Sequence, residues 1–203
     1  MMSFGFVLGN GESRLSVPSR MIDDRDTWAC NLAYRDFAPK NLICCDKHIL
    51  MTAVSQGAGN KSKIWTRNKW FSSMSLEDVE SLPEDFPWPH QIKHDQPMHW
   101  GSGSYAALLA CKSEHDILVF IGFDLWPTKD NLVNNVFKGE RGYGPKDAGP
   151  VSPEGWIHQM CLLMRYYPEK QFVFLNYPSW KPPAQWAAFE NFNHDDLKQL
   201  NNL

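Results

Sequence analysis

Short apolar segments alternate with stretches of helical character along this chain, and this alternation limits the choice of fold more than any other feature. It is typical of α/β proteins in which a mostly parallel sheet is flanked by helices. We therefore expect a Rossmann-like α/β fold. The sequence predicts strands at 4–8, 27–32, 41–45, 63–66, 116–123 and 171–176. It predicts helices at 15–24, 48–55, 75–82, 102–112 and 184–192, with further helical spacing in 153–167.

The length and composition favour a single domain over 1–203. The chain has 203 residues, of which 43% are hydrophobic, enough to build a core of ordinary size. The formal charge of -3, without long basic runs, predicts no nucleic-acid partner. No apolar stretch approaches the roughly 20 residues of a membrane helix, and the N-terminus lacks a signal region, so a cytoplasmic protein is expected. The five cysteines show no metal-ligand spacing, which predicts no metal site.

The first strand runs directly into a glycine turn, in the sequence FGFVLGNGESR. Gly9 and Gly11 allow the backbone to turn tightly and approach a ligand, while Asn10 and Ser13 offer polar side chains at the start of the next helix. Such a junction is suited to a phosphate group. Because the pattern matches neither the dinucleotide nor the P-loop motif, a plain strand-to-helix turn is the alternative.

A second glycine junction begins at Gly101, where Ser102 and Gly103 open a predicted helix. The strand that follows ends in Gly122 and Asp124. In open α/β sheets, ligands lie beyond the carboxyl ends of the strands, so the two junctions together predict a nucleotide held from two sides. Helix capping by the serine and turn capping by the aspartate are the alternatives.

Three blocks of the chain resemble bacterial sialyltransferases of the group that includes the Campylobacter lipooligosaccharide enzymes, and the related DUF115 proteins. The turn from Gly9 to Ser13 is similar to the family's G-N-G-P-S turn, with Glu12 in place of proline. Cys30-Asn31 is similar to its C-N block. The third block, with Ser102-Gly103-x-Tyr105 and then Gly122-x-Asp124, is similar to the S-G-x-Y helix and G-I-D strand end.

The resemblance implies a glycosyltransferase that uses a nucleotide-activated sugar, most closely a CMP-type donor, without a metal or other cofactor. By this resemblance, Asn10 and Asn31 contact the phosphate and ribose side of the donor. Ser102 and Gly103 contact the nucleotide, and a glycan or small molecule accepts the sugar. His158 lies where the family has its histidine base.

An inverting sugar transfer needs a side chain that removes a proton from the acceptor hydroxyl, and imidazole is suited to this near neutral pH. We therefore expect His158 to act as the base and Asp124 to order the site. A histidine buried in the core is the alternative for His158, because its segment has helical apolar spacing. Trp126 replaces a family tyrosine that contacts the departing phosphate, and indole cannot take that role. Tyr143 is a candidate to substitute.

The segment 127–152 is rich in glycine, proline and charge, and has no periodic apolar face. Long irregular segments in compact domains are commonly functional, so we expect a lid. Phosphate contacts are expected from Arg14 and Arg35. Lys138, Arg141 and Lys146 are placed to neutralise phosphate when the lid closes, and solvated surface charge, typical of mobile loops, is the favoured alternative for them.

Two alternatives to a glycosyltransferase stay open. One is a DUF115-like pyrophosphokinase or phosphotransferase, which needs magnesium held by carboxylates such as Asp46 and Asp124. The other is a nucleotide-binding or assembly protein that has kept the fold without the chemistry. The sequence does not decide the oligomeric state, the sugar or the acceptor.

Overall fold

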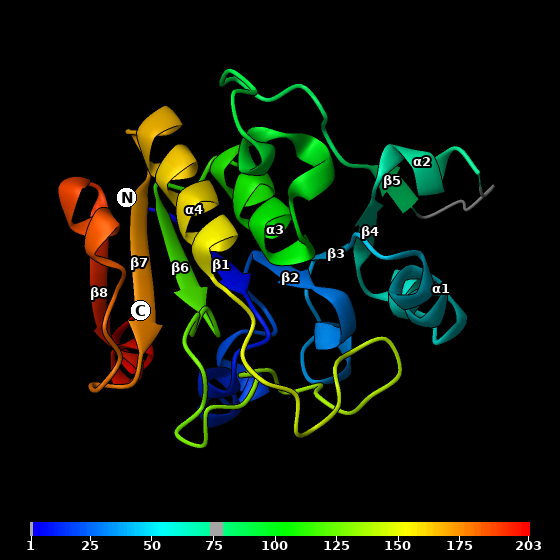
Figure 1. Cartoon of the computed structure of the whole chain (residues 1–203), viewed down its shortest axis with the longest axis horizontal. Helices are drawn as coiled ribbons and strands as arrows, with labels where there is room; N and C mark the ends of the chain where they lie inside the picture. Colours follow the sequence, from blue (N-terminus) through cyan, green and yellow to red (C-terminus); the bar gives the residue numbers. More distant parts are fainter. Residues whose placement is uncertain (1, 74–78) are drawn as a thin grey trace.

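The computed structural model describes residues 2–73 and 79–203, and within these ranges eight parallel strands form one sheet flanked by helices (Figure 1). The strand order is β5-β4-β3-β2-β1-β6-β7-β8. The expected Rossmann-like α/β fold is confirmed. The strands are β1 (Phe4–Leu8), β2 (Thr27–Cys30), β3 (Asn41–Cys44), β4 (Lys63–Thr66), β5 (Val79–Ser81), β6 (Ile117–Ile121), β7 (Gln171–Asn176) and β8 (Phe192–Asp196). The α-helices are α1 (Lys47–Ser55), α2 (Asn68–Phe71), α3 (Ser102–Cys111) and α4 (Glu154–Tyr166).

The sheet has a topological switch point between β1 and β6. From β1 the chain builds β2 to β5 on one side, then crosses back to place β6, β7 and β8 on the other side. Both neighbours pair with β1 in parallel, with Phe6 opposite Thr27 and Val119. In open α/β sheets, the ligand crevice lies at such a point, outside the carboxyl ends of the strands. This edge is the end towards which the arrows of β6 and β7 point in Figure 1.

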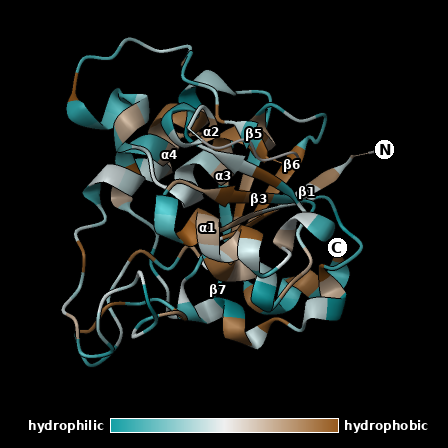
Figure 2. Ribbon diagram, turned by 90° about the vertical axis from the view of Figure 1, so that its right-hand side faces the viewer, coloured by the Kyte–Doolittle hydropathy of each residue, from teal (hydrophilic) through white to brown (hydrophobic). Residues whose placement is uncertain are grey.

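Two apolar layers enclose the sheet because successive side chains of each strand point to opposite faces. Val7 packs with residues of α3 and α4 on one face, and Phe6 and Leu8 pack with residues of α1 on the other. All three side chains are fully buried. Figure 2 shows the hydrophobic strands inside and mostly hydrophilic segments around them. The short apolar runs of the sequence are therefore strands that are covered on both faces.

The predicted strands are found, and three match their expected bounds: 4–8, 63–66 and 171–176. The predictions for 27–32, 41–45 and 116–123 extend too far, because turns begin within them. Asn31 has a left-handed backbone with φ of 58°, and Gly122 has φ of 74°, which ends β6 after Ile121.

Three predicted helices are wrong in whole or in part. The segment 15–24 forms two short 3-10 turns, Glu12–Ser16 and Ser19–Met21, separated by Pro18, which locks the backbone between them. Of the helix expected at 75–82, residues 75–78 lie outside the described residues, and 79–81 form the edge strand β5. The segment 184–192 contains a 3-10 turn at Ala184–Ala188 and then β8, which pairs with the open edge of β7.

The helices predicted at 48–55 and 102–112 are confirmed as α1 and α3, each within one residue at either end. The helical spacing at 153–167 corresponds to α4. Within the ranges described, no helix is both long and apolar enough to cross a membrane.

Candidate functional site

The first glycine turn lies against the turn that follows β6, at the switch point of the sheet. The Gly9 N–H donates to the Ile121 carbonyl at 2.8 Å, and the Gly11 N–H donates to the Gly122 carbonyl at 2.8 Å. A Cβ on Gly9 would lie 2.4 Å from the Gly122 carbonyl oxygen, which is closer than real Cβ atoms approach. Glycine is needed here because two backbones meet.

The carboxylate of Asp124 occupies the concave side of this turn. It accepts hydrogen bonds from the Ser13 N–H at 2.9 Å, from the Ser13 hydroxyl, and from Asn176 Nδ2 at 3.1 Å. A Cβ on Gly11 would lie 2.4 Å from Asp124 Cγ. Asp124 is only 6% exposed. The donors expected to bind a phosphate therefore bind a carboxylate of the protein itself, and Asp124 orders the turn.

Arg14 lies buried beneath the same turn. Its guanidinium donates to the Gly9 carbonyl at 3.2 Å and to Asn10 Oδ1 at 3.1 Å, and it forms an ion pair with Asp36. Phe37 and Phe137 stack near it, with ring centroids 5.4 and 4.9 Å from Cζ. Burial lowers the pKa of Arg14, and the charge of Asp36 opposes this shift.

The segment 127–152, which we name the cover segment, lies on these N-terminal turns (Figure 1). The Val136 N–H donates to the Asn10 carbonyl at 2.9 Å. Lys138 pairs with Glu12 at 2.5 Å, and Glu140 pairs with Arg35. The side chains of Arg35 and Lys138, both expected to contact phosphate, are thus engaged with carboxylates of the protein. Arg141 and Lys146 are exposed.

Three buried polar atoms lack a hydrogen-bond partner near the carboxyl ends of β1 and β2. They are Arg14 Nε, Asn31 Oδ1 and the Tyr143 hydroxyl, and no described residue completes a hydrogen bond to any of them. The Tyr143 ring packs on Phe137 with centroids 5.6 Å apart, and Phe137 lies over Arg14. Burial raises the pKa of Tyr143 well above its usual range.

The Tyr143 hydroxyl lies near the backbone that directly follows Asn31. The backbone N–H of Leu32 faces the Tyr143 hydroxyl and lowers the pKa of Tyr143, although the two groups do not meet hydrogen-bond geometry. Leu32 directly follows Asn31, whose carbonyl accepts from the Cys44 thiol at 3.9 Å. We name Arg14, Asn31 and Tyr143 the polar triad. Buried polar groups are normally satisfied, so these three atoms are candidates to contact a polar ligand.

The helix α3 begins at the same edge of the sheet. Ser102 is buried, and its hydroxyl oxygen accepts from the Cys45 N–H at 2.9 Å, which leaves the hydroxyl hydrogen free to donate elsewhere. Gly103 is half-buried beside Phe123. Helix N-termini present free amides and favour anions. The residues predicted for the second junction thus lie where the sequence places them, at the start of a helix of ten residues.

His158 lies on α4 and points towards the 3-10 turn Lys93–Asp95. Its Nε2 atom lies 2.7 Å from Asp95 Oδ1, and its side chain is 35% exposed. It is therefore not a core histidine. No contact joins it to the polar triad in the described part of the chain. The next residue, Gln159, accepts from the Ser104 hydroxyl at 2.6 Å, which attaches α4 to the first turn of α3.

Trp126 is engaged with the backbone of another loop. Its Nε1 donates to the Lys181 carbonyl at 2.7 Å, and its side chain is partly exposed. The nearby Trp180 donates to the Asp124 carbonyl at 2.8 Å. These indoles join the loops that follow β6 and β7 rather than point to the triad.

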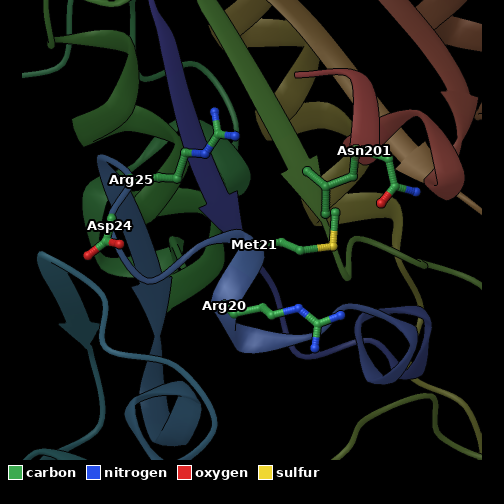
Figure 3. A pocket seen from close by; sticks show the side chains of 6 residues that line it. Arg20, Met21, Asp24, Arg25 and Asn201 are labelled. Atoms are coloured by element: carbon green, nitrogen blue, oxygen red, sulfur yellow. The ribbon is translucent and has the colours of Figure 1, made fainter.

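A separate pocket of about 290 Å³ lies between the turn at Ser19–Met21, the start of β2 and the C-terminal residues (Figure 3). None of the residues predicted to bind or act on a ligand lines it. Its lining residues are Arg20, Met21, Asp24, Arg25, Leu200 and Asn201.

Comparison with protein-family models, with curated proteins and with solved structures gives no match for this chain. Within residues 2–73 and 79–203, no group of three or more His, Cys, Asp or Glu side chains is arranged to hold a metal ion. Asp46, one of the two carboxylates considered for magnesium, is exposed at the start of α1.

Sequence reasoning missed Asp95 and Asn176 as site residues. Asp95 lies in a proline-rich stretch without periodicity, 63 residues before its partner His158. Asn176 ends a strand, which is a weak signal that could have been combined with Asp124. The sequence named both Asn31 and Tyr143, and the structure places an unpartnered buried polar atom on each of them.

Proposed function

We propose that this protein is a metal-independent glycosyltransferase that binds a CMP-type sugar donor at the carboxyl edge of its sheet. The observation that carries the proposal is the polar triad: three buried polar atoms, from three separate parts of the chain, without partners. Leaving a buried donor or acceptor unsatisfied costs about 1–3 kcal/mol, so a guest that satisfies all three gains binding energy from each.

The chemistry of the triad suits a sugar phosphate. Arg14 Nε and the Tyr143 hydroxyl can donate to phosphate oxygens, and Asn31 Oδ1 can accept from a ribose hydroxyl. The Arg14 guanidinium is paired with Asp36 through Nη2, and its Nε–H stays available to donate to a phosphate oxygen. A single ordered water molecule could also satisfy such atoms, and the experiment below separates these two guests.

The first turn of α3 supports the proposal from the other side of the edge. Ser102 retains a hydroxyl hydrogen, and the amides at the start of the helix favour an anion or a polar base edge. In the proposed arrangement the donor lies between the polar triad and this turn. His158, on the helix that packs against α3, takes the proton of the acceptor hydroxyl.

The cover segment lies over the proposed donor site, so the ligand reaches the site when this segment moves. Gly139 and Gly142 both have left-handed backbones, with φ of 85° and 93°, which other residues rarely adopt. The segment is held in place by two ion pairs, by hydrogen bonds that include the one from the Glu12 N–H to Asn134, and by the buried ring of Phe137. Partly exposed ion pairs contribute little stability, which is compatible with opening.

A second candidate is a nucleotide-binding protein that does not catalyse transfer. It is favoured by Trp126, whose N–H is engaged with Lys181 and does not contact a departing phosphate. In this case CMP binds at the polar triad but the sugar donor is not consumed.

The proposal is tested by thermal unfolding with CMP, UDP, GDP and ATP, each with and without magnesium. At a ligand concentration about 100-fold above Kd, binding adds about 2.7 kcal/mol, which raises the Tm of a chain of this size by about 5–10 °C. We expect CMP to give this shift without magnesium. A shift only with ATP and magnesium would instead favour a phosphotransferase, and no shift with any nucleotide would overturn the proposal.

Variants assign the shift to the polar triad. Asn31→Ala and Tyr143→Phe should each reduce the CMP-induced shift, while the matched control Tyr166→Phe, on the exposed side of α4, should keep it. If both triad variants bind CMP like the unaltered protein, the nucleotide binds elsewhere. Turnover of a CMP-activated sugar then separates the transferase from the non-catalytic candidate.

A further inference from the structure

The contact between His158 and Asp95 joins α4 to the irregular segment that precedes α3. Gly155, in the first turn of α4, allows this approach, because a Cβ there would lie 2.8 Å from His94 Nδ1. Asp95 ends the 3-10 turn Lys93–Asp95. Trp88 holds this turn, because its Nε1 donates to the Asp95 carbonyl at 3.1 Å. The position of the carboxylate is therefore set by buried structure.

Asp95 is oriented by hydrogen bonds to both of its oxygens. Oδ2 accepts from the N–H groups of Gln91 and Ile92, each at 2.9 Å, and Oδ1 lies 2.7 Å from His158 Nε2. Burial opposes ionisation of Asp95, but the hydrogen bonds from His158 and the two amides outweigh it and lower the pKa of the carboxyl group. Asp95 is thus an anion near neutral pH, and an anionic carboxylate can only accept.

The ionised state of Asp95 fixes which nitrogen of His158 carries the proton. Because the carboxylate accepts, Nε2 must be the protonated nitrogen of the neutral imidazole, and Nδ1 then carries the lone pair. With its side chain 35% exposed, His158 is accessible, whereas Asp95 is not. A carboxylate that orients a histidine base in this way also stabilises the imidazolium that forms when the base takes a proton.

We propose that Asp95 is the positioning residue for His158, holding it as the Nε2–H tautomer so that Nδ1 is the atom that receives a proton from an acceptor hydroxyl. The role in sugar transfer rests on the proposed function, whereas the tautomer does not. In that reaction the acceptor oxygen forms its bond to the sugar as the bond from the sugar to the phosphate breaks. The nucleotide phosphate leaves with the electron pair, the acceptor proton moves to Nδ1, and Asp95 balances the imidazolium charge.

Other titratable groups lie near this pair. His94 contacts α4 at Gly155, and Glu154 lies one helical turn before His158 on the exposed start of α4. Lys93 lies on the same 3-10 turn as Asp95 and is exposed. Among the described contacts of the His158 ring, only the one with Asp95 is an ion pair or hydrogen bond.

The tautomer is measured by two-dimensional NMR that correlates the ring protons with the ring nitrogens of labelled protein at neutral pH. His158 is assigned by loss of its signals in His158→Gln. We expect Nε2 to carry the proton and Nδ1 to show the shift of an unprotonated nitrogen. A protonated Nδ1, or an even mixture of tautomers in the unaltered protein, would overturn the proposal even if CMP binds.

Variants of Asp95 test its positioning role. In Asp95→Ala we expect a mixed tautomer and a loss of sugar-donor turnover of about 100-fold, the lower end of what a general base contributes, with the CMP-induced Tm shift retained. The control Asp85→Ala, at an exposed position of the same segment, should change neither. In Asp95→Asn the amide oxygen should stay with the two backbone N–H groups and turn the NH2 group towards Nε2, which should move the ring proton of His158 to Nδ1. If Asp95→Ala keeps both the tautomer and full turnover, the carboxylate does not position His158. Loss of the CMP shift in the unaltered protein would instead refute the proposed function alone.

Discussion

Replacement of Asp124 by alanine tests whether this carboxylate holds the first glycine turn together. Asp124 accepts from the Ser13 amide, the Ser13 hydroxyl and Asn176, and the variant leaves these three donors without their partner in a buried place. Each unsatisfied buried donor costs about 1–3 kcal/mol, so with partial access of water we expect a loss of about 3–5 kcal/mol. Native domains are stabilised by only about 5–15 kcal/mol, so this is a large fraction of the total.

The loss is measured by urea unfolding followed by tryptophan fluorescence, and by Tm. For a chain of this size, about 4 kcal/mol corresponds to a decrease of about 8–16 °C in Tm. The control Asp130→Ala, at an exposed position shortly after Asp124, should change the free energy of unfolding by less than about 0.5 kcal/mol. Ser13→Ala combined with Asp124→Ala should cost less than the sum of the two, because the variants remove the same bonds. If Asp124→Ala is as stable as its control, the turn does not depend on this carboxylate.

Three further predictions concern Gly122, Asp95 and Phe137. Gly122→Ala should lose about 1–3 kcal/mol because φ is 74° and a Cβ would lie 2.9 Å from a facing carbonyl oxygen, whereas Gly149→Ala, with open space around it, should be neutral by urea unfolding. Asp95 has a lowered pKa in the folded protein, so its stabilising contribution should be present above pH 3.8 and disappear as pH falls through that lowered value. The free energy of unfolding of Asp95→Asn and of the unaltered protein is measured across this pH range. The difference between them should shrink as pH falls, and a difference that stays constant or grows would show that the sign is wrong. Phe137→Ala should cost about 3 kcal/mol and speed hydrogen exchange in the cover segment, while Val151→Ala, exposed in that segment, should do neither.

The sequence predicts the central part of the sheet because strands such as β1 and β7 are short apolar runs between turn residues, a pattern that buried parallel strands impose. The sequence does not predict β5 or β8, because neither has the pattern of a buried strand. β5 has three residues, and most of β8 is polar and exposed, so neither carries the pattern of a buried strand. Both become strands because the edges of β4 and β7 offer unpaired backbone groups.

In the candidate site, too, the sequence predicts some features and not others. Glycine positions are visible in the sequence because close backbone approach and left-handed turns require them, and Gly9 and Gly122 meet as these requirements imply. The sequence does not predict that Asp124 binds inside this turn, because Asp124 and Ser13 are 111 residues apart in the chain. The polar triad depends on tertiary folding in the same way, since Tyr143 comes from an irregular segment whose path no local pattern encodes.

The central claim is that the polar triad binds the nucleotide part of a sugar donor, and a crystal structure of the protein with CMP tests it most directly. We predict that CMP lies at the carboxyl ends of β1 and β2 beneath the closed cover segment, with its phosphate or ribose hydrogen-bonded to Arg14 Nε, Asn31 and Tyr143. The claim is contradicted if the three atoms are bridged by water alone while CMP binds in the pocket lined by Arg20 and Arg25, or does not bind.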